Sequence, residues 1–122
     1  MNKKVAKFVK RLNSKTRVVV LDILGSPTKW NLIQFYKANP FSIHTPRGLA
    51  NIIGRKADLV HKEAEELTNA GVLKKISENG SFSSIYSYEP EADIACVIDA
   101  LIEIGNERRN FIDDLCNIIK NG

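Results

Sequence analysis

Apolar residues recur every three or four positions over most of this chain, which is the spacing of one face of an α-helix. Over residues 3–24 the pattern predicts one amphipathic helix that ends at Gly25. From Pro90 onward the same spacing continues to Ile119. It predicts a closing helix of about 28 residues, roughly 42 Å long at a rise of about 1.5 Å per residue.

Three shorter helices are predicted between these two. Ser26 before Pro27, and Thr45 before Pro46, each place a capping side chain directly before a proline, which favours the start of a helix. The three predicted helices run from Pro27 to just before Pro40, from Pro46 to Gly54, and over residues 56–70.

After Gly71 the composition becomes that of β-strands. Residues 72–77 and 82–88 are rich in β-branched and aromatic side chains, and they flank the sequence Glu78-Asn79-Gly80-Ser81. The Asn-Gly pair tolerates the positive φ angles of a type I′ turn, so residues 72–88 are predicted to form a β-hairpin.

This order of elements predicts a fold that is mainly α-helical with a small β-hairpin. Two helices joined at Gly54-Arg55 and followed by a hairpin have the layout of a winged helix-turn-helix. In that fold the second helix enters the major groove of DNA and the hairpin lies along the flanking backbone. At 122 residues we expect one domain, with a basic N-terminal helix (1–25), a winged core (26–88) and a C-terminal dimerisation helix (89–122).

The helix predicted over 56–70 turns one side inward and another toward DNA. Its inward stripe consists of Ala57, Val60, Ala64 and Leu67. For His61 we weigh a base or phosphate contact against an exposed residue with no special role. Lys74 and Lys75 are either ordinary strand-edge charges or phosphate contacts, and we favour the second because they lie at the base of the hairpin. The residues predicted to contact DNA are Thr45, Arg47, Arg55, Lys56, Asp58, Leu59, His61, Lys62, Lys74, Lys75, Asn79 and Ser81.

Three short motifs are similar to landmarks of a known family. Residues 24–30 read Leu-Gly-Ser-Pro-Thr-Lys-Trp, residues 49–50 read Leu-Ala, and residues 67–73 read Leu-Thr-Asn-Ala-Gly-Val-Leu. In order and spacing they resemble the Leu-x-x-Pro-x-Arg, Leu-Ala and Leu-x-x-Ala-Gly-Leu-Val motifs of the prokaryotic ArsR-type and MarR-type winged-helix repressors. The resemblance covers residues 20–88 and implies a dimeric, sequence-specific transcriptional regulator that binds double-stranded DNA.

The chain also departs from that family. Where the ArsR-type recognition helix reads Val-Ser-Arg-His-Leu, residues 60–64 read Val-His-Lys-Glu-Ala, and the Cys-Val-Cys metal motif is absent. Neither the operator preference nor metal sensing is therefore carried over to this chain.

Charge divides along the sequence and bears on the kind of partner. Residues 1–75 carry fifteen Lys/Arg against five Asp/Glu, whereas residues 76–122 carry three against nine. An excess of ten positive charges favours a polyanion over the first alternative, a winged-helix module that binds another protein. Seven bases and no acid among residues 1–17 leave a second alternative open, a nonspecific chromatin-associated or replication-associated DNA binder.

The chain ends predict a homodimer. A terminal helix of about 42 Å overruns a core of this size, so a second copy is expected to cover part of its apolar stripe. Two-fold symmetry would set two reading helices about 34 Å apart, which predicts a palindromic operator. The residues assigned to the dimer interface are Val5, Phe8, Leu12, Leu101, Phe111, Ile112, Leu115 and Ile119.

Catalytic and metal-binding motifs are sparse. The chain has two isolated histidines, His44 and His61. It has no nucleophile elbow, phosphate loop or zinc-protease motif, which argues against an enzyme. Cys96 and Cys116 would fall on nearly opposite sides of one straight helix, so we favour small buried apolar residues over metal ligands and expect no cofactor. The longest apolar run, residues 18–21, is far shorter than the roughly 20 residues that span a membrane. We therefore expect a cytoplasmic, nucleoid-associated protein without a membrane partner.

Overall fold

The computed structural model describes residues 3–77, 84–107 and 111–121, and the side chains of residues 6–76, 84–106 and 115–120. The chain forms two compact units. The terminal unit combines Met1–Gly25 with Ala92–Gly122, and the central unit consists of Ser26–Glu91. Because the two ends of the chain belong to one unit, the N-terminal and C-terminal helices share a core.

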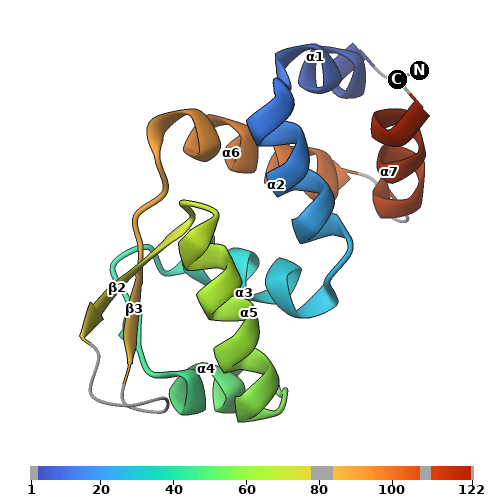
Figure 1. Ribbon diagram of the computed structural model, residues 1–122. Helices are drawn as coiled ribbons and strands as arrows, with labels where there is room; N and C mark the ends of the chain where they lie inside the picture. Colours follow the sequence, from blue (N-terminus) through green and yellow to red (C-terminus); the bar gives the residue numbers. More distant parts are fainter. Residues whose placement is uncertain (1–2, 78–83, 108–110, 122) are drawn as a thin grey trace. The chain divides into compact units, whose positions relative to one another are not determined.

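Four helices make up the described part of the terminal unit: α1 (Lys3–Arg11), α2 (Ser14–Leu24), α6 (Ala92–Glu107) and α7 (Phe111–Asn121). Both α1 and α2 contact both α6 and α7 (Figure 1). This mutual packing replaces the two long amphipathic helices that the apolar spacing predicts.

The prediction of one helix over residues 3–24 is wrong because Asn13 caps a new helix. Its Oδ1 accepts a hydrogen bond from the backbone N–H of Thr16 (2.9 Å), and its own N–H donates to Thr16 Oγ1 (2.9 Å). This reciprocal capping box satisfies donors that a helix start leaves unpaired, and it stabilises a break between α1 and α2.

The single closing helix of about 42 Å is also wrong, because α6 and α7 are separate helices that both pack against α1 and α2. Leu115 on α7 is 1% exposed and Ile119 is 2% exposed. These two side chains are already covered within one chain, so they do not require a second copy, and the homodimer stays a prediction. Of the residues assigned to a dimer interface, those buried in the structure are Phe8, Leu12, Leu101, Leu115 and Ile119, while the side chains of Val5, Phe111 and Ile112 lie outside the described ones.

The described residues of the central unit form three helices and a small sheet: α3 (Pro27–Ala38), β1 (Ile43–His44), α4 (Pro46–Ile53), α5 (Ala57–Asn69), β2 (Leu73–Ser77) and β3 (Ile85–Tyr88). The starts predicted for α3 and α4 are confirmed. Ser26 Oγ accepts from the N–H of Lys29 (3.1 Å), and Thr45 Oγ1 accepts from the N–H of Gly48 (3.1 Å). Each cap precedes a proline that is already set for helical geometry.

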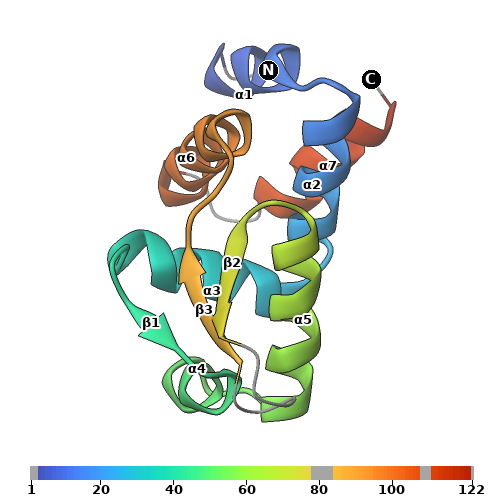
Figure 2. The same cartoon turned by 60° about the vertical axis from the view of Figure 1, so that its left-hand side comes forward.

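The three strands are antiparallel in the order β1-β3-β2, and Figure 2 shows β3 between its two neighbours. The predicted pairing of the two hairpin strands is confirmed, while its turn, Glu78–Ser81, lies outside the described residues. His44 lies in β1, where it pairs with Tyr86 of β3. The prediction of a mainly helical chain with a small hairpin is therefore confirmed, with one strand added.

Buried tyrosines tie the sheet to α3. The Tyr36 hydroxyl donates to the carbonyl oxygen of Tyr86 (3.1 Å), both side chains are fully buried, and the Tyr36 ring stacks on Tyr88 with centroids 6.1 Å apart. Burial raises the pKa of Tyr36 well above its usual value, so its hydroxyl remains a donor at every physiological pH. These contacts fix the sheet against the helices of the central unit.

Candidate nucleic-acid interface

A short turn connects α4 to α5 and determines how the two helices meet. Gly54 has the left-handed conformation (φ 72°), which glycine adopts without steric strain, and its N–H donates to the carbonyl oxygen of Ala50 (2.9 Å). The N–H of Arg55 donates to the same oxygen (3.1 Å). Because α4 and α5 also pack closely on each other, they form a compact pair of helices joined by three residues, 54–56.

The inward stripe predicted for α5 is confirmed at three of its four positions. Val60, Ala64 and Leu67 are no more than 1% exposed, and Ala57 is half-buried. On the other side, the positions predicted to face a partner are open to solvent: Lys56, Asp58, Leu59 and Lys62 are exposed, and His61 is half-buried. The first two turns of α5 therefore present two basic side chains, one acidic side chain and the apolar Leu59.

The acidic residues in the second half of α5 are engaged inside the central unit. Lys29 on α3 is only 3% exposed, and its Nζ lies 2.6 Å from Glu66 Oε1 and 3.3 Å from Glu63 Oε2. Ser26 Oγ also donates to Glu63 Oε1 (3.2 Å). The hydrogen bond from Lys29 lowers the pKa of Glu66, so this carboxylate is ionised and paired at neutral pH.

Glu65 joins α5 to both strands of the hairpin. Lys75 Nζ on β2 lies 2.6 Å from Glu65 Oε1, the Tyr86 hydroxyl on β3 donates to the same oxygen, and His61 Nε2 lies 3.8 Å away. The hydrogen bonds from Lys75 and then Tyr86 lower the pKa of Glu65. Lys75, which was predicted to contact phosphate, is therefore ion-paired within the chain, whereas Lys74 is exposed.

A shallow, open hollow lies where α4, the turn and α5 meet. Its lining residues are Ala50, Asn51, Gly54, Arg55, Lys56 and Leu59. Arg55 donates from Nε and Nη2 to Asn31 Oδ1 on α3 (3.0 and 2.8 Å), which orients the guanidinium while the residue stays exposed. The structure thus brings three predicted contact residues, Arg55, Lys56 and Leu59, to one surface.

The other predicted contact residues have separate positions. Arg47 is exposed on α4, and Thr45 is the N-cap of that helix, so its hydroxyl is engaged with the backbone. Asn79 and Ser81 lie outside the described residues. Sequence reasoning missed Lys29, Asn31 and Tyr86, which bind residues of the α4–α5 surface from elements distant in the sequence.

The structure changes the meaning of the charge division along the chain. The central unit carries eight Lys/Arg and seven Asp/Glu, and the terminal unit carries ten and seven. The excess of ten positive charges in residues 1–75 is therefore split between two units and is offset by acidic residues from the end of the chain. Electrostatic attraction of the central unit to a polyanion depends on which charges face outward.

No group of three or more His, Cys, Asp or Glu side chains that could hold a metal ion occurs among the described residues. Cys96 on α6 is exposed and Cys116 on α7 is half-buried, and both are free thiols. The two cysteines lie on different helices, so the prediction that they fall on opposite sides of one straight helix is wrong. Within the described ranges, no helix is long and apolar enough to cross a membrane.

Comparison with family models, curated proteins and solved structures gives no match to this chain.

Proposed function

We propose that the central unit binds double-stranded DNA as a winged helix-turn-helix, with α5 as the recognition helix in the major groove and the β2–β3 hairpin beside the backbone. The observation that carries this proposal is the division of charge on α5. Three of its four acidic residues, Glu63, Glu65 and Glu66, are bound to Lys29, Lys75 and Tyr86. Lys56 and Lys62 face solvent, together with the one exposed acid, Asp58.

The order of elements supports this assignment. The central unit runs α3, β1, α4, α5, β2, β3, with the short β1 completing a sheet against β3. In a winged helix-turn-helix, the helix after the turn reads base edges while basic residues around it contact phosphates. The exposed bases of the central unit are Arg47, Arg55, Lys56, Lys62 and Lys74, and we assign phosphate contacts to this set.

Leu59 gives this surface a means of direct readout. It is 38% exposed on the outward side of α5 and lines the hollow beside Arg55 and Lys56. An apolar side chain flanked by basic groups suits contact with thymine methyl groups in the major groove. We therefore propose sequence-specific binding and a role as a transcriptional regulator.

Lys62→Ala tests the recognition surface. Loss of one phosphate contact is expected to weaken DNA binding and to lower the slope of log K against log salt by about 1. The melting temperature should stay the same, because Lys62 is exposed. Fluorescence anisotropy with duplexes selected from a random pool measures both effects.

Lys120→Ala is the matched control, since it removes one exposed positive charge from α7 in the terminal unit. Equal affinities for the parent, Lys62→Ala and Lys120→Ala would contradict the assignment of α5 as recognition helix. A palindromic motif in the selected pool would indicate a two-fold regulator, and a single half-site would indicate a monomeric one.

The alternatives give different outcomes in the same selection. A protein-binding module would enrich no duplex at all. A nonspecific DNA binder that uses the exposed bases of α1 would enrich duplexes without a motif, and Lys10→Ala would then weaken binding at least as much as Lys62→Ala.

A further inference from the structure

Asn31 on α3 determines how the guanidinium of Arg55 is oriented. Its Oδ1 accepts hydrogen bonds from Arg55 Nε (3.0 Å) and Arg55 Nη2 (2.8 Å), and both donors lie on one edge of the planar group. We propose that Asn31 is a positioning residue for DNA binding, which holds Arg55 so that the outer guanidinium edge binds one backbone phosphate beside Lys56. This inference rests on the proposed function and extends the DNA-binding surface to α3.

The guanidinium keeps the donors that a phosphate requires. Arginine has five N–H donors in a fixed planar arrangement, and the two hydrogen bonds to Asn31 use two of them. Because the group is planar, the remaining donors include a parallel pair on the outer edge, one on Nη1 and one on Nη2. Such a pair matches two oxygens of a phosphate, which arginine binds through two parallel hydrogen bonds. The contact with Asn31 therefore leaves the phosphate-binding edge of Arg55 open.

The backbone of Arg55 is fixed as well as its side chain. Its N–H donates to the carbonyl oxygen of Ala50 (3.1 Å) at the end of α4, directly after the left-handed Gly54. A flexible side chain that must be ordered on binding weakens the affinity about two- to tenfold. Arg55 is already held at its backbone and at its guanidinium, so we expect most of this loss to be avoided.

The open hollow where α4 and α5 meet favours a phosphate over the edge of a base. Two of its lining residues, Arg55 and Lys56, are exposed cations, and none of them is acidic. The exposed acid of α5, Asp58, does not line the hollow. Base edges in the major groove are neutral donors and acceptors, whereas every backbone phosphate carries a negative charge. Two neighbouring cations therefore suit one phosphate, with Arg55 as the oriented ligand and Lys56 as a second point charge.

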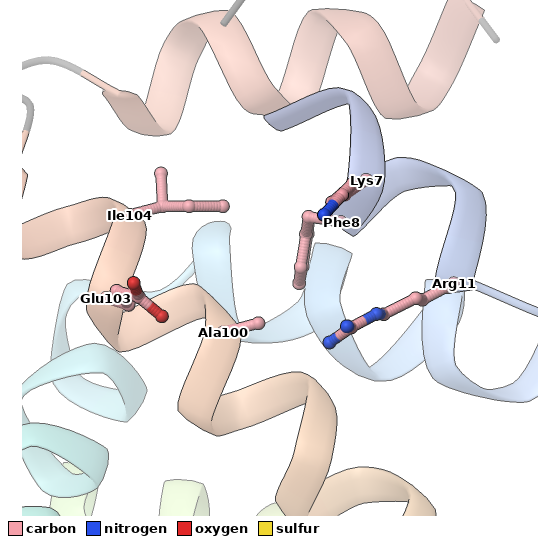
Figure 3. Close-up of a pocket in the computed structure, with 6 residues that line it drawn as sticks. All are labelled: Lys7, Phe8, Arg11, Ala100, Glu103 and Ile104. Atoms are coloured by element: carbon pink, nitrogen blue, oxygen red, sulfur yellow. The ribbon is translucent and has the colours of Figure 1, made fainter. Parts of the chain in front are cut away.

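Another hollow, in the terminal unit, provides a matched control. It lies between α1 and α6, and Figure 3 shows Arg11 and Lys7 on the α1 side and Glu103 on the α6 side. Its lining thus contains an acid together with the two cations. Arg11 is exposed like Arg55, so Arg11→Ala removes the same kind of side chain from a hollow to which we assign no phosphate contact.

Fluorescence anisotropy of the full chain with a selected duplex tests the two residues separately. Arg55→Ala should weaken binding about tenfold or more and lower the slope of log K against log salt by about 1, because one phosphate contact is lost. Asn31→Ala should weaken binding about two- to tenfold with an unchanged slope, because the charge of Arg55 remains. Arg11→Ala should bind as the parent does. The Asn31–Arg55 hydrogen bonds are exposed, so the melting temperature should not change in any of these variants.

The double variant Asn31→Ala/Arg55→Ala separates positioning from a role in packing. If Asn31 acts through Arg55, the double variant should bind as weakly as Arg55→Ala alone. A defect in the packing of α3 would weaken binding further. Duplexes with one uncharged methylphosphonate at a time then locate the contact, because one position should weaken binding by the parent and have no effect on Arg55→Ala.

Three results would each overturn the proposal: additive losses in the double variant, an unchanged salt slope in Arg55→Ala, or an equal loss in Arg11→Ala. An unchanged slope with weaker binding would indicate a base contact instead of a phosphate contact. Lys62→Ala distinguishes this failure from that of the proposed function. If Lys62→Ala weakens binding and Asn31→Ala does not, only the role of Asn31 is refuted. If no duplex binds, the proposed function fails and this inference fails with it.

Discussion

Replacement of Lys29 by methionine probes the buried ion pairs on which the exposed charge of α5 depends. Lys29 is 3% exposed and Glu63 is 9% exposed, so Lys29→Met leaves a desolvated carboxylate next to an apolar side chain. Removal of one partner from a buried pair typically destabilises a protein by about 3–5 kcal/mol, which is about two to four orders of magnitude in the folding equilibrium. We expect a loss near the lower end, about 3 kcal/mol, because Glu63 keeps its hydrogen bond from Ser26.

The assay is urea unfolding followed by the fluorescence of Trp30. This residue is the only tryptophan of the chain, is half-buried on α3 and directly follows Lys29, so it reports on the central unit. Lys62→Met is the matched control on an exposed position, with an expected change of no more than about 0.5 kcal/mol. Glu63→Leu added to Lys29→Met should recover much of the loss, because no unpaired charge then remains buried.

The pH dependence gives this prediction a second readout. Lys29 lowers the pKa of Glu66 below the usual glutamate value of 4.5, so the pair stabilises the folded state above that value and loses its effect as the pH falls through the lowered pKa. The stability difference between parent and Lys29→Met should thus be full at pH 7 and shrink below about pH 4.5. A loss under about 1 kcal/mol at pH 7, or one that is unchanged in acid, would refute the reasoning.

Two further predictions concern the backbone of the α4–α5 turn and the terminal core. Gly54→Ala should lower the free energy of unfolding in urea by about 1 kcal/mol, because φ is 72° at this position. No atom lies within 4 Å of an added Cβ, so the loss comes from backbone strain alone. Gly54→Asn should cost less, because asparagine tolerates this conformation better. Leu115→Ala should destabilise the terminal unit by about 2–5 kcal/mol without changing the sedimentation coefficient of the chain, since Leu115 is buried within one copy. If Leu115→Ala instead changed the oligomeric state and left the free energy of unfolding unchanged, that result would support a dimer interface at α7.

Local signals allowed the sequence to predict much of the central unit. The starts of α3 and α4 depend on a serine or threonine next to a proline, and the capping hydrogen bond reaches only three residues along the chain. The break between α1 and α2 was equally local, because Asn13 and Thr16 form a capping box. It was missed because the apolar spacing continues across it, with Leu12 and Thr16 both buried on the same stripe.

Other features depend on contacts that no spacing rule can reveal. The strand β1 has only two residues, too few for an alternation, and it exists because Ile43 and His44 pair with residues of β3 more than forty positions later. The apolar stripe of α7 could be covered within one chain or by a second copy, and the sequence pattern is the same in both cases. The packing of α1 and α2 against α7 in one unit covers it within the chain. The homodimer therefore stays a prediction, although this stripe no longer requires it.

The charge on the proposed recognition surface shows why the candidate site could be only partly predicted. In the sequence alone, residues 56–70 contain three glutamates in their second half, and these would repel DNA there. Lys29 reaches this segment from 37 residues away, and Lys75 reaches it from the adjacent strand, so the acidic half of α5 is neutralised by contacts within the fold. Removal of Lys62 therefore tests a contact with DNA, whereas removal of Lys29 or Lys75 uncovers a carboxylate and changes the field of the whole surface. Loss of affinity in a Lys75 variant would report on Glu65 as much as on a missing phosphate contact, which makes Lys62 the cleaner test of the proposed function.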